Sequence, residues 1–139
     1  MSSTLFSLPD YEGLLAHLRG AIPLIGGQAA AFWVLRYAPE SPCPVSQDID
    51  FLATGEEVRG IAPGAVRELR FPHRRDRTNL SAVGRVDTPA GTSPVEFLHT
   101  VPGLDVTVPE VIFSDDRTDV GTPIRVLEPV SLMMTKLFA

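Results

Sequence analysis

The sequence predicts one α+β domain, in part α/β-like, in which a mixed β-sheet is flanked by helices across residues 1–139. Three observations support this prediction. A chain of 139 residues, of which 44% are hydrophobic, is long and apolar enough to bury one core. Segments with helical periodicity and short apolar segments of strand length both recur along the chain. Stretches rich in proline and glycine separate these segments and mark the turns.

The first half predicts, in order, a helix, a strand, a helix, a loop and a strand. These segments are residues 9–19, 22–26, 27–37, 38–46 and 47–53. Leu14, Leu15 and Leu18 form one apolar stripe, which is typical of an amphipathic helix. The second helix is Ala-rich and free of breakers, and the loop after it holds three prolines. The last strand lacks strict alternation of Ile49 and Leu52, so we expect burial on both of its faces.

The second half predicts short helices, four strands and a final helix. The segments are residues 54–70 for one or two short helices, 79–88, 93–100, 108–116 and 122–128 for strands, and 128–139 for the helix. The first two strands should form a hairpin around Pro89, Ala90 and Gly91. Pro129 suits the first turn of the final helix. That helix runs to the last residue without a capping residue, so we expect the chain to be a fragment of a longer protein.

Charge and cysteine content point to a cytoplasmic protein. The formal net charge is −5, which does not indicate a general nucleic-acid binder. Cys43 is the only cysteine, so no intramolecular disulfide can form, and a reducing compartment fits. The first residues lack the basic and apolar regions of a signal peptide. The most apolar window, residues 21–37, is interrupted by proline and glycine, so we expect no association with a membrane.

A pair of carboxylates lies in an apolar strand. Asp48 and Asp50 are two residues apart, which places both side chains on one face of a strand. Two adjacent carboxylates repel each other and each is costly to bury, and a divalent cation offsets both effects. Glu96, in a second apolar strand, is the best candidate for a third carboxylate, because Val95 and Phe97 should point away from it. The set of oxygen ligands predicts a site for Mg²⁺ or Mn²⁺.

A glycine pair precedes this strand by one helix. Gly26 and Gly27 follow one predicted strand and open the next helix. Glycine allows the backbone to approach a ligand closely, and the helix N-terminus presents free N–H groups that favour phosphate. The order strand, Gly-Gly, helix, loop and strand with Asp-x-Asp predicts a site for a metal-bound nucleoside triphosphate.

These motifs resemble the nucleotidyltransferase superfamily, which shares the palm of DNA polymerase β. "GGQAAAFW" followed by "SQDIDFL" is similar to its pattern of a Gly-Gly turn, a helix and Asp-x-Asp on the next strand. Within the superfamily the chain most resembles the AbiEii-like and MenA-type group, many members of which are toxins of toxin–antitoxin systems. Ser46 fits that group's Ser-x-Asp-x-Asp pattern, whereas Glu96 stands where the group commonly has Asp. Lys136 matches the lysine of the helix that follows the core strands.

The resemblance implies a nucleotidyltransferase fold and the transfer of a nucleoside monophosphate from an NTP to an acceptor hydroxyl. The acceptor would be tRNA or a protein, and the partner of a toxin would be a cognate antitoxin. Asp48 and Asp50 would bind the metal, and Glu96 would share a second metal or act as general base. The implied nucleotide-binding residues are Gly26, Gly27, Ser46 and Lys136.

Plainer interpretations remain for each of these residues. The aspartates could be solvated acids at a strand end, the glycines a simple turn, and Glu96 the exposed face of a hairpin. Ser46 and Lys136 could be solvated residues without a ligand. At the level of function, the alternatives are a catalytically inactive nucleotide- or partner-binding module and a metal-dependent nuclease.

A local basic run contrasts with the acidic whole. Residues 67–77 hold five arginines and His73, and they form either a solvated loop or a site for a polyanion such as NTP or tRNA. The three histidines, His17, His73 and His99, show no metal-ligand spacing. We expect Phe32 and Trp33 in the core and a polar turn over residues 115–119.

Overall fold

The computed structural model describes residues 14, 17–18, 22–38, 40, 48–61, 64–88, 91–104, 113–117 and 123–137. Its helices and strands, in chain order, are β1 Leu24–Ile25, α2 Gly26–Tyr37, β2 Ile49–Leu52, α3 Gly55–Ile61, β3 Arg67–Arg70, β4 Leu80–Thr88, β5 Gly91–Leu98, β6 Phe113–Arg117, β7 Pro123–Leu127 and α5 Pro129–Leu137. Leu14, His17 and Leu18 are also helical, within the segment predicted as the first helix.

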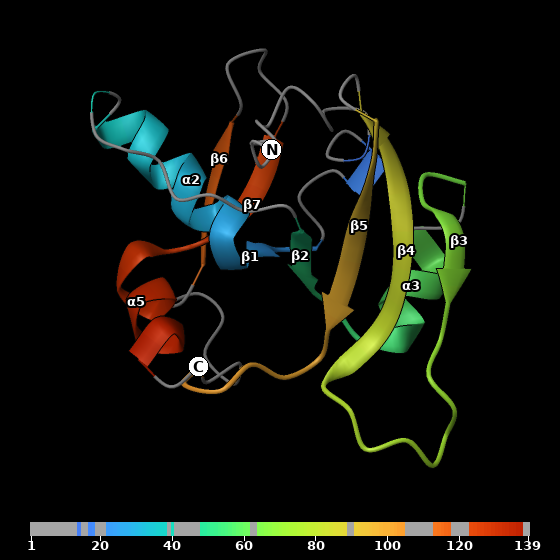
Figure 1. The fold of residues 1–139 in the computed structure, drawn as a ribbon. Coiled ribbons are helices and arrows are strands. Elements are labelled where there is room, and N and C mark those ends of the chain that lie inside the picture. Colours follow the sequence, from blue (N-terminus) through green and yellow to red (C-terminus); the bar gives the residue numbers. More distant parts are fainter. Residues whose placement is uncertain are drawn as a thin grey trace, which may run out of the picture.

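One mixed sheet organises the protein, which confirms the predicted α+β class. Its seven strands lie in the order β3-β4-β5-β2-β1-β7-β6, and Figure 1 shows the long β4–β5 hairpin near one end. β2 pairs with β5 and β1 with β7 in parallel, whereas the other neighbours are antiparallel. The first and second halves of the chain therefore interleave at the centre of the sheet.

The core lies against one face of the central strands. Ile49, Phe51, Val95 and Phe97 are at most 1% exposed, and the rings of Phe51 and Phe97 stack with centroids 5.7 Å apart. Asp50 lies on the opposite face of β2, where it is half-buried. The expectation that this strand is buried on both faces is therefore wrong, because its apolar residues alternate with half-buried ones.

The helices sit at opposite ends of the sheet. Figure 1 shows α2 and α5 close together, and α3 against β4. Phe32 is buried in the core, and Trp33 packs against it while its indole Nε1 donates a hydrogen bond of 2.8 Å to the Leu127 carbonyl of β7. Both residues were predicted in the core, and the indole hydrogen bond links α2 to the strand before α5.

Side chains close the first turns of α3 and α5. Thr54 and Glu57 form a reciprocal capping box, with the Thr54 N–H donating to Glu57 Oε1 at 2.9 Å and the Glu57 N–H to Thr54 Oγ1 at 3.2 Å. Glu128 Oε1 accepts the Ser131 N–H at 2.7 Å, directly ahead of Pro129 in the first turn of α5. Local sequence therefore defines where both helices begin.

The two edge strands were not predicted correctly. Residues 67–70, expected in a helical region, form β3, and Asp115 and Asp116, expected in a polar turn, belong to β6. Both strands lie at the edges of the sheet and have one neighbour each. Charged residues are common on edge strands because they discourage pairing with other chains, so these segments lack the apolar alternation that identifies a strand.

Among the helices of the described residues, none combines the length and the apolar character needed to cross a membrane.

Candidate active site

Gly26 is the point where strand, helix and carboxylate meet. β1 ends at Ile25, and Gly26 begins α2 with a φ of +70°, a left-handed conformation that favours glycine. A Cβ atom placed at Gly26 would lie 2.6 Å from Asp50 Oδ2, closer than side chains approach one another. The close approach expected of a glycine here is confirmed, and the group that approaches is the Asp50 carboxylate itself.

The N-terminus of α2 helps to explain why a carboxylate is tolerated at this depth. The N-cap residue Ile25 makes no side-chain capping hydrogen bond, and the first turn contains no acidic residue. The helix dipole favours negative charge at such an end. Asp50, packed against Gly26, brings a negative charge from the neighbouring strand to this N-terminus.

Asp50 and Glu96 are neighbours across two parallel strands. The register of β2 with β5 places Asp50 opposite Glu96, with Ile49 opposite Val95 and Phe51 opposite Phe97. Directly paired residues share a face of the sheet, and the Cα atoms of adjacent strands are about 4.8 Å apart. Both carboxylates are half-buried on the face opposite the core. The structure thus brings together two of the three predicted acidic residues.

Asp48 lies at the approach to this pair. It directly precedes β2 and is exposed. Among the residues that the structure describes, no group of three His, Cys, Asp or Glu side chains is close enough to hold a metal ion. Mg²⁺, however, takes one or two carboxylates and completes its shell with water and substrate phosphates. Asp50 and Glu96 supply hard oxygen ligands of that kind, so this donor set fits the ion.

The remaining predicted phosphate contacts are placed only in part. Gly27 is the second residue of α2 and is half-buried beside Gly26. Ser46 lies outside the described residues, as does Cys43. Lys136 belongs to α5, but its side chain is not among those described. The roles of Ser46 and Lys136 therefore stay predictions.

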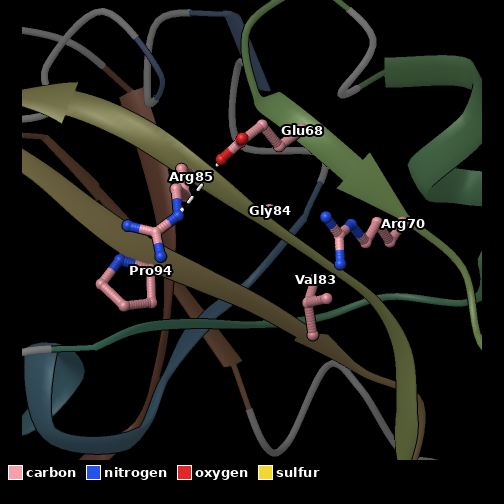
Figure 2. A pocket seen from close by; sticks show the side chains of 6 residues that line it. All are labelled: Glu68, Arg70, Val83, Gly84, Arg85 and Pro94. Carbon is pink, nitrogen blue, oxygen red and sulfur yellow. Dashed lines mark ion pairs between the residues drawn. The ribbon is translucent and has the colours of Figure 1, made fainter.

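Two features near the site were not identified from the sequence. Gln28, the third residue of α2, is 2% exposed, so a polar side chain is buried beside the glycine turn. A pocket also opens on the face that carries Glu96, and Figure 2 shows Arg70 and Arg85 among the side chains that line it. The only signal for this pocket in the sequence was the arginine run, which did not specify a partner strand.

The histidines of the second half support loops, as expected. His99 Nε2 lies 3.0 Å from the Thr78 carbonyl oxygen, and His73 Nδ1 accepts the Arg75 N–H at 3.2 Å. Both contacts stabilise the connection between β3 and β4. They give these two side chains structural roles in the described part of the chain.

Comparison with known proteins gives little beyond the fold. No family model matches the chain, and no curated protein matches it. A crystal structure of a protein from H. pylori, assigned only provisionally as a nucleotidyltransferase, is similar with a TM-score of 0.49 and 16% sequence identity. The match covers 93% of this chain and 57% of the other, so the chain spans little more than half the length of that protein.

Proposed function

We propose that this chain is a nucleotidyltransferase, or the nucleotide-binding part of one, that moves a nucleoside monophosphate from an NTP to an acceptor hydroxyl. One observation carries the proposal: Asp50 is packed against the Gly26 turn on one side and lies in register with Glu96 on the other. This arrangement joins a helix N-terminus suited to phosphate with two carboxylates suited to a hard cation.

The residues divide the work of the reaction. Gly26 and Gly27, at the start of α2, hold the triphosphate through backbone N–H groups, with Ser46 and Lys136 as further contacts. Asp48 and Asp50 hold Mg²⁺ on the triphosphate, and the bound ion neutralises the charge that develops on the phosphates. Most of the acceleration then comes from positioning the reactants.

Glu96 is the proton acceptor in this proposal. The acceptor hydroxyl oxygen forms a bond to the α-phosphorus, and the bond from the α-phosphorus to the bridging oxygen breaks. Pyrophosphate leaves with that electron pair, and the hydroxyl proton passes to the Glu96 carboxylate. The neighbouring position of Asp50 on β2 brings the attacking group and the phosphate to one sheet face.

The test compares label transfer between matched variants. We expect wild-type protein to transfer α-labelled NTP to an acceptor in a cell extract with Mg²⁺, and Asp48→Asn/Asp50→Asn to lose at least ~100-fold of that rate. Asp87→Asn, an exposed carboxylate of β4, is the matched control and should retain activity. Unchanged transfer in the double variant would refute the mechanism. NTP binding without transfer by the wild type would instead favour an inactive binding module.

A role as a toxin follows from the same resemblance. The pattern around Ser46, Asp48 and Asp50 is similar to that of the AbiEii-like and MenA-type group. In such a role, the acceptor would be tRNA or a protein, and a cognate antitoxin would restrain the enzyme. Controlled expression in a bacterial host should arrest growth with the wild type and not with Asp50→Asn, provided that both accumulate equally.

A further inference from the structure

The pocket beside Glu96 continues the sheet face that carries the carboxylates. It has a volume of about 340 Å³ and is lined by Glu68, Arg70, Val83, Gly84, Arg85 and Pro94. Figure 2 shows these side chains on β3, β4 and β5. The pocket is therefore built from three adjacent strands.

The strand register connects the pocket to the carboxylate pair. Val83 lies opposite Glu96, and Arg70 lies opposite Val83. Asp50, Glu96, Val83 and Arg70 thus form one row across four strands on one face. At about 4.8 Å per strand, the Cα of Arg70 is ~10 Å from that of Glu96, a span that a long arginine side chain partly covers.

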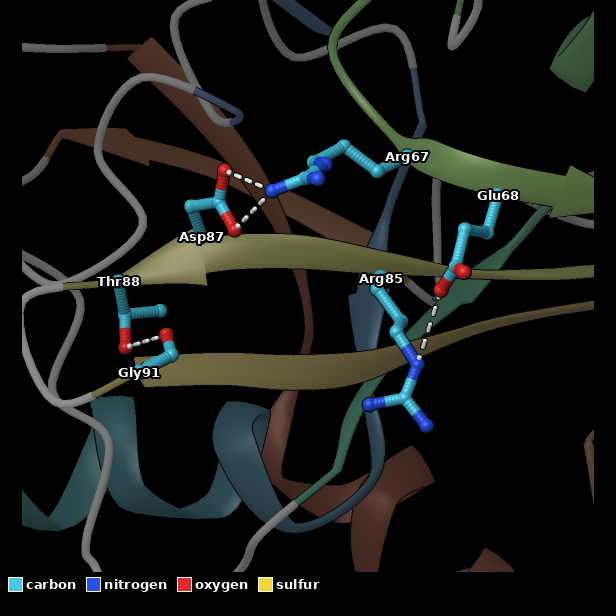
Figure 3. Close-up of polar contacts among 6 residues, drawn as sticks. All are labelled: Arg67, Glu68, Arg85, Asp87, Thr88 and Gly91. Atoms are coloured by element: carbon cyan, nitrogen blue, oxygen red, sulfur yellow. Dashed lines mark hydrogen bonds and ion pairs between the residues drawn. The ribbon is translucent and has the colours of Figure 1, made fainter.

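A bulge in β3 shapes the pocket wall. The register with β4 shifts between Arg67 and Arg70, and Glu68 adopts a φ of +53°, which is unusual for a residue other than glycine. The bulge turns Glu68 toward Arg85, whose Nε lies 3.2 Å from Glu68 Oε2. Figure 3 shows this ion pair beside the separate pair of Arg67 with Asp87. The two pairs occupy the cations that adjoin the bulge.

Arg70 differs from these two arginines. Within the described part of the chain it makes no ion pair, and it is exposed at the pocket. Arg74, Arg75 and Arg77 are also exposed, in the loop that follows β3. The turn hydrogen bond of 3.0 Å from the His73 N–H to Asp76 Oδ2 orders this loop. A series of cations therefore leads from the pocket along the loop.

The distribution of charge over the chain favours a polyanion here. Residues 67–85 hold six of the twelve basic residues, whereas fifteen of the seventeen acidic residues lie elsewhere. A polyanion would be repelled by most of the surface and attracted to this segment. Guanidinium groups also match phosphate oxygens in geometry and charge.

We propose that the Arg70–Arg85 pocket binds a backbone phosphate of a single-stranded polynucleotide acceptor, adjacent to the hydroxyl that reacts at Glu96. This inference rests on the proposed function and names its substrate class. The loop arginines contact further phosphates along the strand. Glu68 competes with the phosphate for Arg85, because a single guanidinium now satisfied by a carboxylate must exchange partners when the strand binds.

The test measures binding of a fluorescently labelled single-stranded RNA of twelve nucleotides by anisotropy at several salt concentrations. Arg70→Gln/Arg85→Gln should weaken binding about tenfold or more, and should reduce the slope of log K against log salt by ~1.4, which corresponds to two lost phosphate contacts. Glu68→Gln should strengthen binding. Arg67→Gln on the same strand, which removes the same charge outside the pocket, is the matched control and should change affinity by less than about threefold.

A second measurement separates this proposal from the proposed function. Binding of ATP with Mg²⁺ should be unchanged in Arg70→Gln/Arg85→Gln and lost in Asp48→Asn/Asp50→Asn. The acceptor proposal is overturned if the arginine variant binds RNA with the affinity and salt slope of the wild type. It is also overturned if the variant loses ATP binding, or if arginine-dependent label transfer reaches only proteins. Loss of ATP binding by the wild type would refute the transferase while RNA binding still reports on the pocket.

Discussion

At the scale of single residues, glycine and aspartate at the site depend on each other. Gly26 has a positive φ and lies against Asp50 Oδ2. Any other residue would strain the backbone and displace the carboxylate. The helix start and the acidic pair are thereby coupled through one position.

Replacement of Gly26 tests this coupling. Gly26→Ala should lower the free energy of unfolding by about 1–3 kcal/mol, because alanine at this φ is strained. It should also weaken binding of ATP with Mg²⁺, since Asp50 must move. Denaturant titration and calorimetry measure the two effects.

The control is a glycine without either constraint. Gly60 lies in α3 with an ordinary φ and has no heavy atom within 4 Å of an added Cβ. Gly60→Ala should leave ATP binding intact and stabilise the protein by up to about 1 kcal/mol. Equal behaviour of the two alanine variants would show that Gly26 is an ordinary turn residue.

At the scale of elements, capping residues make α3 a testable unit. Thr54→Ala removes one half of the capping box and should lower the free energy of unfolding by about 1 kcal/mol. Thr54→Ser keeps the hydroxyl and should restore most of that loss. Urea titration of the wild type and both variants measures these differences. A Thr54→Ser variant as unstable as Thr54→Ala would assign the effect to the methyl group instead.

The elements also show how far the sequence alone predicts this fold. β1, α2, β2 and α5 were predicted because apolar runs, an Ala-rich segment and Pro129 are local signals. β3 and β6 were missed because edge strands carry charges in place of apolar alternation.

The site was predicted to the same local limit. The strand positions of Asp50 and Glu96 follow from alternation within each strand, but their pairing depends on long-range register. The pocket at Arg70 depends on a bulge and on the pairing of β3 with β4, neither of which has a local signature.

At the scale of the whole molecule, the interleaved strand order predicts one cooperative domain. Strands from both halves alternate at the centre of the sheet, and buried residues from Ile22 to Leu132 share one core cluster. Neither half can unfold without exposing apolar residues of the other. We therefore expect two-state unfolding of the 139-residue chain.

Trp33 makes this expectation measurable, since it is the only tryptophan and bonds to β7 on the side of the sheet away from the β4–β5 hairpin. Its fluorescence and the far-ultraviolet circular dichroism of the whole chain should give coincident urea transitions. Val95→Ala, in β5, should shift both midpoints equally, corresponding to a loss of about 2 kcal/mol, because the cavity in one half weakens the common core. A shift confined to the dichroism signal, with fluorescence unchanged, would show that the two ends of the sheet unfold independently.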